Sequence, residues 1–325
     1  MHSQTLPHVG KTSNLPMGVL FILIGASSYG MLSTFVKLAY KTGFTTAEVT
    51  GAQFVWGALV LTILAAFLPK NSTKATWSET WQLMAAGTTV GFTSVLYYVA
   101  VNYINASIAV VLLMQSVWLG VLFESLMKKT FPTIDKIIAV VLVLAGTLLA
   151  TNALDAANSH LDIRGVIFGL LAAVSFSGTM SATGSIASHL APVKRSQIML
   201  YGGSIVVAVF ALVTQLGPHY MDLNLVSPEF IHNKAFDFHI FLTYGLFVAV
   251  FGTILPPIML NKGFPITGVA LGSIISSIEL PFAMMIATAL LGEHIGAMQF
   301  VGVAVIIVSV FVLNFRMILK ERAKA

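Results

Sequence analysis

The sequence contains no cysteine and very few charged residues. The absence of cysteine excludes disulfide bonds and thiolate metal sites, and it leaves the redox environment of the chain undefined. Charged residues make up only 9% of the 325 residues, whereas a soluble domain has about 25%. So few charges cannot coat a water-soluble globule of this length. The composition therefore excludes an ordinary soluble protein.

Most of the chain is apolar. Hydrophobic residues account for 57% of the chain, and its mean hydropathy is +0.90. A transmembrane helix needs about 20 apolar residues to cross a hydrocarbon core about 30 Å thick. The chain contains a succession of such runs. We therefore predict an all-α membrane protein with ten transmembrane helices, over residues 17–40, 46–68, 80–101, 105–127, 134–152, 164–187, 195–217, 239–260, 266–291 and 296–316.

The basic residues predict the orientation, because Lys and Arg accumulate on the cytoplasmic side of membrane proteins. If the N-terminus is cytoplasmic, thirteen of the 17 basic residues lie inside. The four left outside are Lys37, Lys41, Arg164 and Lys234. We therefore predict that the N and C termini are both cytoplasmic. The net charge of +5 reflects this bias and does not indicate a nucleic-acid partner.

One apolar stretch occurs twice. Residues 18–30 read GVLFILIGASSYG, and residues 165–177 read GVIFGLLAAVSFS. The match is position by position, so that Tyr29 in the first copy corresponds to Phe176 in the second. An odd number of crossings separates the copies, so the second enters the membrane from the opposite face.

The repetition extends beyond these stretches. The segment that ends in Glu48, before the second helix, corresponds to the segment that ends in Arg195, before the seventh. We predict two inverted five-helix repeats, residues 17–152 and 164–316. Two similar halves in opposite orientation can swap conformations, which gives two states of similar energy, one open to each side of the membrane. Inverted repeats are typical of secondary transporters.

The end of the second repeat carries a motif. Residues 279–302 read ELPFAMMIATALLGEHIGAMQFVG. This resembles the acidic-proline element and the following Leu-Gly-Glu turn of EamA-type members of the drug/metabolite transporter (DMT) superfamily. Residues 115–117 (QSV) and 128–130 (KKT) stand at the corresponding places of the first repeat. The resemblance spans about residues 17–316 and implies a multi-pass transporter of the bacterial cytoplasmic (inner) membrane.

Glu279 is the main candidate for a functional residue. It is the one charged residue in the run 263–292 and falls near the middle of the bilayer. A carboxylate at that depth must be neutralised, paired or hydrated, so it faces the bundle interior or a wet cavity. The functional interpretation is a group that titrates protons or binds a substrate amine. The alternative is a protonated carboxyl bonded to a neighbouring helix, with Ser276 one turn away.

Further polar residues lie inside the predicted helices. Lys37, in the outer third of the first helix, either extends to the interface or turns inward to an anionic group. The other substrate-contact candidates have helix packing as their alternative: Gln53, Trp56, Tyr97 and Gln115.

Three prolines predict irregular backbone at mid-membrane depth. A proline inside a helix removes a backbone hydrogen bond and kinks the chain. In a membrane the freed carbonyls are tolerated beside protein or a water-filled cavity. We therefore predict helix breaks and a central cavity at Pro256, Pro257 and Pro281.

These observations favour a secondary, ATP-independent transporter, because the chain has no phosphate-binding loop. The resemblance implies export of amino acids, related small metabolites or drug-like compounds by alternating access. A nucleotide-sugar-type exchanger, an uptake permease and a non-transport scaffold or enzyme remain alternatives. We predict no enzymatic activity, no catalytic residue, no cofactor, no metal site and no nucleic-acid partner. The expected partners are a small-molecule substrate, protons as a candidate coupling ion, and the lipid bilayer.

Overall fold

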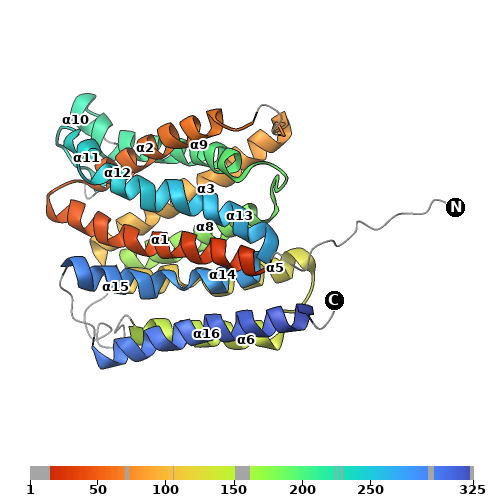
Figure 1. Ribbon diagram of the computed structural model, residues 1–325. Helices are drawn as coiled ribbons and strands as arrows, with labels where there is room; N and C mark the ends of the chain where they lie inside the picture. The colour runs from red at the N-terminus through yellow and green to blue at the C-terminus, as the bar shows by residue number, and fades with distance from the viewer. Residues whose placement is uncertain are drawn as a thin grey trace.

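A computed structural model describes residues 15–69, 73–104, 106–150, 162–223, 225–227, 230–291 and 296–322. Helices form most of this part of the chain, and it contains no β-strand. Figure 1 shows the long helices running roughly parallel to one another. The all-α class is the one that the composition predicts.

Capping boxes fix the starts of two helices in the first half of the chain. The hydroxyl groups of Thr45 and Thr76 accept hydrogen bonds from the backbone N–H groups of Glu48 and Glu79, and each glutamate accepts one in return. The helices of this half are α1 (Leu15–Lys41), α2 (Thr46–Ala66), α3 (Trp77–Tyr103), α4 (Ala106–Leu113), α5 (Ser116–Lys128) and α6 (Ile134–Ala150).

Two π-helical turns, η1 (Leu212–Leu216) and η3 (Val250–Ile254), interrupt the helices of the second half. Such turns are rare and widen a helix locally. The helices of this half are α8 (Ile163–Ser185), α9 (Pro192–Ala211), α10 (Gly217–Tyr220), α11 (His239–Leu242), α12 (Tyr244–Ala249), α13 (Leu255–Thr267), α14 (Val269–Ser276), α15 (Glu279–Leu291) and α16 (Ala297–Arg322).

Eight helical stretches of the described chain are long and apolar enough to cross a membrane. They are Leu15–Lys41, Thr46–Ala66, Trp77–Tyr103, Ala109–Lys128, Ile163–Ser185, Pro192–Tyr220, Tyr244–Thr267 and Val269–Leu290. Two of the ten predicted spans are not among them, because α6 has only 17 residues and the last helix contributes the shorter apolar stretch Ala297–Val310. Ten crossings, inverted repeats and cytoplasmic termini therefore stay predictions.

Two long helical stretches are broken at comparable places. The first breaks between α4 and α5, at residues 114–115, and the second between α14 and α15, at residues 277–278. Gln115 is the second residue of the first break, and Glu279 begins the helix after the second. Both breaks thus fall where the motif of the second repeat and its counterpart in the first repeat are found.

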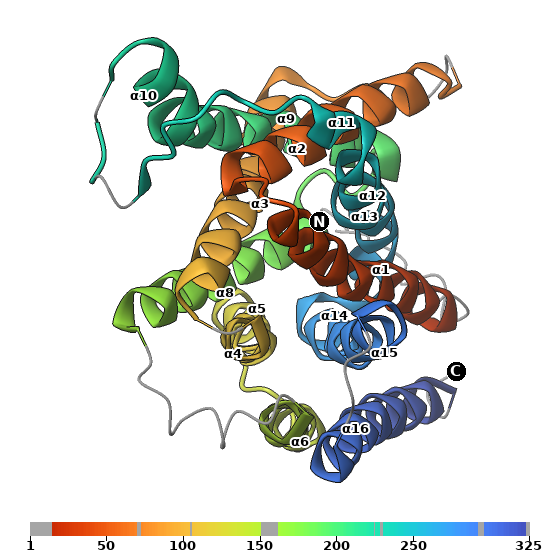
Figure 2. The same ribbon diagram turned by 90° about the vertical axis from the view of Figure 1, so that its left-hand side faces the viewer.

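The packing of the helices divides the bundle into a main body and an edge. In the main body α3 packs against α8 and α9, while α1 packs against α13 and α15. The pair α6 and α16 lies along one edge, as Figures 1 and 2 both show. The site described next lies in the main body.

Candidate functional site

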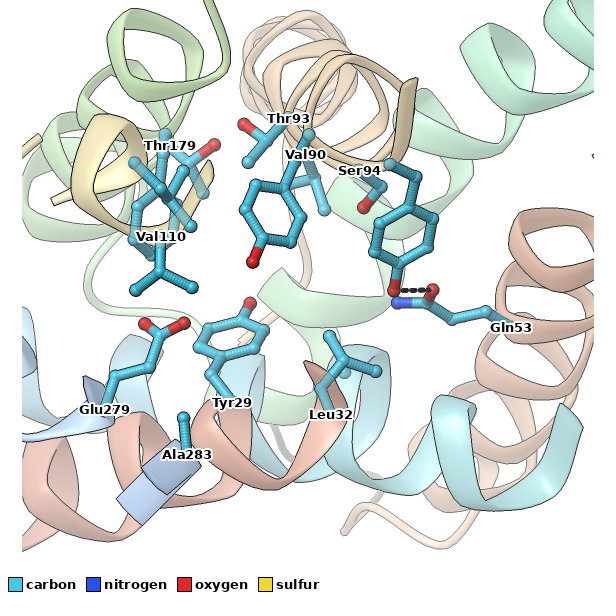
Figure 3. Close-up of a pocket in the computed structure, with 15 residues that line it drawn as sticks. Tyr29, Leu32, Gln53, Val90, Thr93, Ser94, Val110, Thr179, Glu279 and Ala283 are labelled. Atoms are coloured by element: carbon cyan, nitrogen blue, oxygen red, sulfur yellow. Dashed lines mark hydrogen bonds between the residues drawn. The ribbon is translucent and has the colours of Figure 1, made fainter. Parts of the chain in front are cut away.

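A cavity lies inside the main body, between α1, α2, α3, α4, α8, η3 and α15. The empty space between its lining side chains, part of which is open to the outside, is about 720 Å³. Its wall combines apolar side chains with a few polar groups that converge on one space (Figure 3). Because so many helices contribute to it, the cavity forms only in the folded bundle.

Glu279 supplies the carboxylate of this cavity. It is the first residue of α15, directly after the break at residues 277–278, and Figure 3 shows its carboxylate directed into the cavity beside Tyr29. Its Oε2 atom is buried and has no hydrogen-bond partner among the described residues. The described residues that line the cavity include no Lys, Arg or His. The lining therefore offers no cation to pair with this carboxylate.

Aromatic rings form much of the remaining wall. Tyr29 packs edge-on against Phe176, with ring centroids 5.9 Å apart and an interplanar angle of 86°. Tyr97 and Tyr98 project from α3, and the Tyr98 hydroxyl donates a hydrogen bond of 3.0 Å to Oε1 of Gln53 (Figure 3). Aromatic faces attract cations and also stack on other rings. The wall thus suits a ligand that is positively charged, aromatic or both.

A second, smaller cavity continues from the first toward the end of the bundle where α8 ends and α9 begins. Its empty space, part of which is open to the outside, is about 340 Å³, and it shares Tyr29, Val90 and Thr179 with the central cavity. Asn261 belongs to its lining, and the buried Oδ1 atom of that residue has no hydrogen-bond partner in the described chain. The shared residues place the two cavities next to each other.

Arg195 is bonded to two residues of this lining, Thr183 and Asn261. Its side chain is fully buried and donates hydrogen bonds to the backbone oxygens of Thr183 (2.6 Å), Asn261 (2.9 Å) and Ile186 (3.1 Å). The first and third of these acceptors lie at the end of α8, where helix carbonyls carry a partial negative charge. One guanidinium therefore ties α8 and α13 to the start of α9.

Glu48 performs the corresponding task at the opposite end. Its carboxylate is fully buried and accepts hydrogen bonds from Nε2 of Gln215 (2.8 Å) and the backbone N–H of Asp237 (2.9 Å). The Nζ atom of Lys234 lies 3.2 Å from it. Glu48 of α2 thus holds the connection between α10 and α11 in place through Lys234 and Asp237.

Three of the predicted site residues lie together. Glu279, Gln53 and Tyr97 all line the central cavity, although they come from three different helices. Gln53 is held by Tyr98, and its backbone oxygen accepts a hydrogen bond of 3.2 Å from the Thr253 hydroxyl next to Gly252 in η3. These residues form the polar part of the site.

Four other predicted site residues are not among those that line the cavity. The Trp56 indole donates to the Phe241 carbonyl (3.0 Å). The amide of Gln115 bridges the break between α4 and α5: its Nε2 donates to the Val111 carbonyl, and its Oε1 accepts from the Trp118 indole. The Ser276 hydroxyl donates to the Gly272 carbonyl one turn back (2.9 Å), and Lys37 is a partly exposed residue of α1.

The predicted helix-breaking prolines lie next to irregular backbone. Pro256 and Pro257 follow η3 directly, at the start of α13. Pro281 is the third residue of α15, just after the break at residues 277–278. Pro257 also lines the smaller cavity. Pro256 and Pro281 are themselves buried in the bundle.

The sequence pattern does not mark Glu48 or Arg195 as functional residues, because charged residues near helix ends are usually exposed. The available signal was their correspondence in the two repeated segments, where residues of opposite charge occupy matching positions at opposite ends of the bundle. The structure adds that both are fully buried.

Glu124 makes more contacts than its sequence neighbours indicate. The ion pair with Lys128, four residues later, is present at 2.5 Å, and Lys136 of α6 lies 3.6 Å away. The carboxylate also accepts a hydrogen bond from the backbone N–H of Ala270, in the first turn of α14. Glu124 therefore joins α5 and α6 to the helix that leads to Glu279.

Known proteins resemble the chain over nearly its whole length. The profile of the EamA-like transporter family matches it twice, over residues 16–152 and 163–315. The protein named "Uncharacterized transporter YcbK" from Bacillus subtilis (strain 168) is 22% identical over 301 residues, 90% of this chain and 91% of that protein. A solved structure known as "Crystal structure of protein" has a TM-score of 0.70 and 14% identity, and covers 93% of this chain and 98% of that one. At that identity the likeness concerns the fold alone.

Proposed function

The chain belongs to the EamA-like transporter family, and from this premise we propose that it is a secondary transporter that exports amine-bearing compounds by alternating access. The substrates are small metabolites, amino acids included, or drug-like molecules. The central cavity is the substrate site, and Glu279 binds the amine or exchanges it for a proton. Membrane transport follows from the family, whereas substrate class, direction and coupling are the proposed parts.

The unpaired carboxylate carries this proposal. Burying a charge without a partner is costly, and the cost falls when a cation or a proton joins it. Among the described residues Oε2 of Glu279 has no hydrogen-bond partner, and tyrosine rings stand beside it in the lining. An ammonium group gains both a carboxylate and aromatic faces at this place. A substrate that carries an amine and an apolar body therefore suits the cavity.

The same lining disfavours the nucleotide-sugar alternative. Phosphate groups are usually held by Arg or Lys side chains. The described residues around the cavity include neither, and Lys37 is not among them. A phosphate-bearing substrate would instead meet the carboxylate of Glu279. An uptake permease would use the same cavity, so direction has to be measured.

Alternating access is supported by the way both ends of the bundle are held. Arg195 ties one end and Glu48 the other, and each bond network must open for a substrate to pass. Tyr29 and Phe176, which correspond in the repeated stretches, are in contact beside the cavity. Such a contact is expected for residues near the axis that relates two repeats.

Counterflow in liposomes tests the proposed substrate class. We expect labelled tyramine to enter liposomes that contain the purified protein and are preloaded with unlabelled tyramine. 3-(4-Hydroxyphenyl)propionate has the same ring and a similar length but the opposite charge, and we expect it to enter at least about ten-fold more slowly. Protein-free liposomes measure the leak of each compound. Equal rates for the two compounds would overturn the proposal.

The orientation can be tested because the chain lacks cysteine. Leu225 is 68% exposed in the connection between α10 and α11, and Phe131 is 99% exposed between α5 and α6, at the other end. In intact cells a membrane-impermeant maleimide should label Leu225→Cys and should reach Phe131→Cys only after permeabilisation. The reverse pattern would mean that the termini lie outside the cytoplasm.

A further inference from the structure

An apolar groove lies outside the central site, between α5 and α6. The space along it, which includes open solvent, is about 1,020 Å³. It exists because α6 packs mainly against α16 and makes little contact with α5 (Figure 2). The apolar side chains that line it include Trp118, Leu122, Leu126, Phe131, Ile137 and Val141. All of these except Phe131 belong to α5 and α6 themselves.

One end of the groove is polar and positively charged. Ser125, Lys129 and Thr130 contribute groups that can donate hydrogen bonds, and Lys129 is exposed at the C-terminal cap of α5. The neighbouring cations Lys128 and Lys136 are paired with Glu124. Lys129 is the one charged residue among those that line the groove.

The length of the groove matches one leaflet of a bilayer. Along α5 the lining runs from Trp118 to Lys129. At about 1.5 Å per residue this distance is about 16 Å, and half of a hydrocarbon core is about 15 Å. The polar end lies where the span Ala109–Lys128 ends, at the depth of the lipid headgroups. The apolar part therefore lies beside the acyl chains of a single leaflet.

We propose that this groove binds one anionic phospholipid from that leaflet. An acyl chain lies along the apolar wall, and the headgroup phosphate receives hydrogen bonds from Lys129 and from the Ser125 or Thr130 hydroxyl. The argument for an anionic lipid is charge complementarity. A zwitterionic headgroup brings an ammonium group, and the lining has no carboxylate to receive it. An anionic headgroup such as that of phosphatidylglycerol has a phosphate to pair with Lys129 and no ammonium group that would lack a partner.

Trp118 makes the proposal measurable. It lines the groove and is 38% exposed, and Trp56, Trp77 and Trp81 can be replaced by Phe so that it alone fluoresces. The single-tryptophan protein is placed in phosphatidylcholine vesicles that contain a small fraction of lipid with brominated acyl chains. We expect brominated phosphatidylglycerol to quench Trp118 at about a five-fold lower fraction than brominated phosphatidylcholine does. This ratio corresponds to about 1 kcal/mol for one cation at the membrane surface.

A charge variant and its control separate the site from general attraction to the surface. Lys129→Gln should abolish the five-fold preference, whereas Lys74→Gln, an exposed lysine before α3, should leave it intact. Equal quenching by both lipids, or a preference that survives Lys129→Gln, would overturn the proposal. Absence of quenching by either lipid would also overturn it, because a second copy or another protein would then cover the groove.

A second measurement needs no change of tryptophan. In native mass spectrometry, the protein with all four tryptophans should retain one phosphatidylglycerol molecule in preference to phosphatidylcholine. The Lys129→Gln protein should lose this adduct under the same activation energy. If both proteins retain the anionic lipid equally, the groove is not its site.

Discussion

Glu279→Gln protein is expected to fold and to lose amine transport. Glutamine keeps the volume and hydrogen-bonding capacity of the side chain but removes the negative charge. The lining has no other carboxylate, so an ammonium group loses its charged partner. A hydrogen bond to a charged group contributes about 1.5–3 kcal/mol. We therefore expect tyramine affinity, measured by competition in counterflow, to fall by about ten-fold or more.

The same variant separates substrate binding from proton coupling. If Glu279 only carries protons, flux driven by a pH gradient collapses while tyramine exchange at fixed pH persists. If it binds the amine, both fail. If it is merely a structural residue, both continue at the normal rate and only the melting temperature changes. Wild-type pH-driven flux in Glu279→Gln liposomes would therefore remove this residue from the mechanism.

A control is needed for the stability of that protein. The neutral amide costs less to bury than a carboxylate, so the melting temperature of Glu279→Gln should equal or exceed that of the unchanged protein. Thr93→Ala removes another polar group from the same lining without changing its charge. We expect this protein to keep most of its transport. A comparable loss in both variants would point to cavity shape as the cause.

The all-α class of the fold was predictable because it follows from the amino-acid composition. Long charge-free runs dictate membrane helices, and the helices observed lie within a few residues of most predicted ranges. The break before Glu279 lies close to Pro281, where the sequence predicts one, whereas no proline marks the break at residues 114–115. What sequence could not decide is how far α6 and α16 extend across the membrane.

The site was predictable only in part, for a geometric reason. A helix places its side chains on all sides, and one sequence does not tell which side faces the cavity. Gln53 and Trp56 are three residues apart on α2, yet only Gln53 lines the cavity. Glu279 was recognisable because its charge allows a single kind of environment in a membrane. Uncharged candidates lack that constraint.

Glycine residues at a contact between two helices help to set the shape of the cavity. Gly87 of α3 and Gly202 of α9 lie where the two backbones touch. A Cβ atom added to Gly87 would meet the backbone of Met199, and one added to Gly202 would meet the backbone of Met84. Small residues permit such close approach between membrane helices. α3 also carries Tyr97 and four other residues of the cavity lining, so this contact positions the site.

Gly87→Ala is expected to force α3 away from α9, because rigid backbone rather than a flexible side chain occupies the space. Overpacking of this kind costs about 1–3 kcal/mol or more. The melting temperature in detergent should fall by several degrees, and tyramine counterflow should weaken as Tyr97 shifts. Gly178→Ala on α8 is the matched control, since its Cβ would lie at an ordinary 3.5 Å from Thr89 of the same helix α3.

The double variant Gly87→Ala/Gly202→Ala shows whether the two single variants lose stability through the same contact between α3 and α9. Once Gly87→Ala has separated the helices, Gly202→Ala has less to disturb, so the combined loss of stability should be smaller than the sum of the single losses. Two independent defects would instead give additive losses. Additive losses, or a Gly178→Ala protein as unstable as Gly87→Ala, would show that the approach of α3 to α9 is not what holds the cavity wall in place.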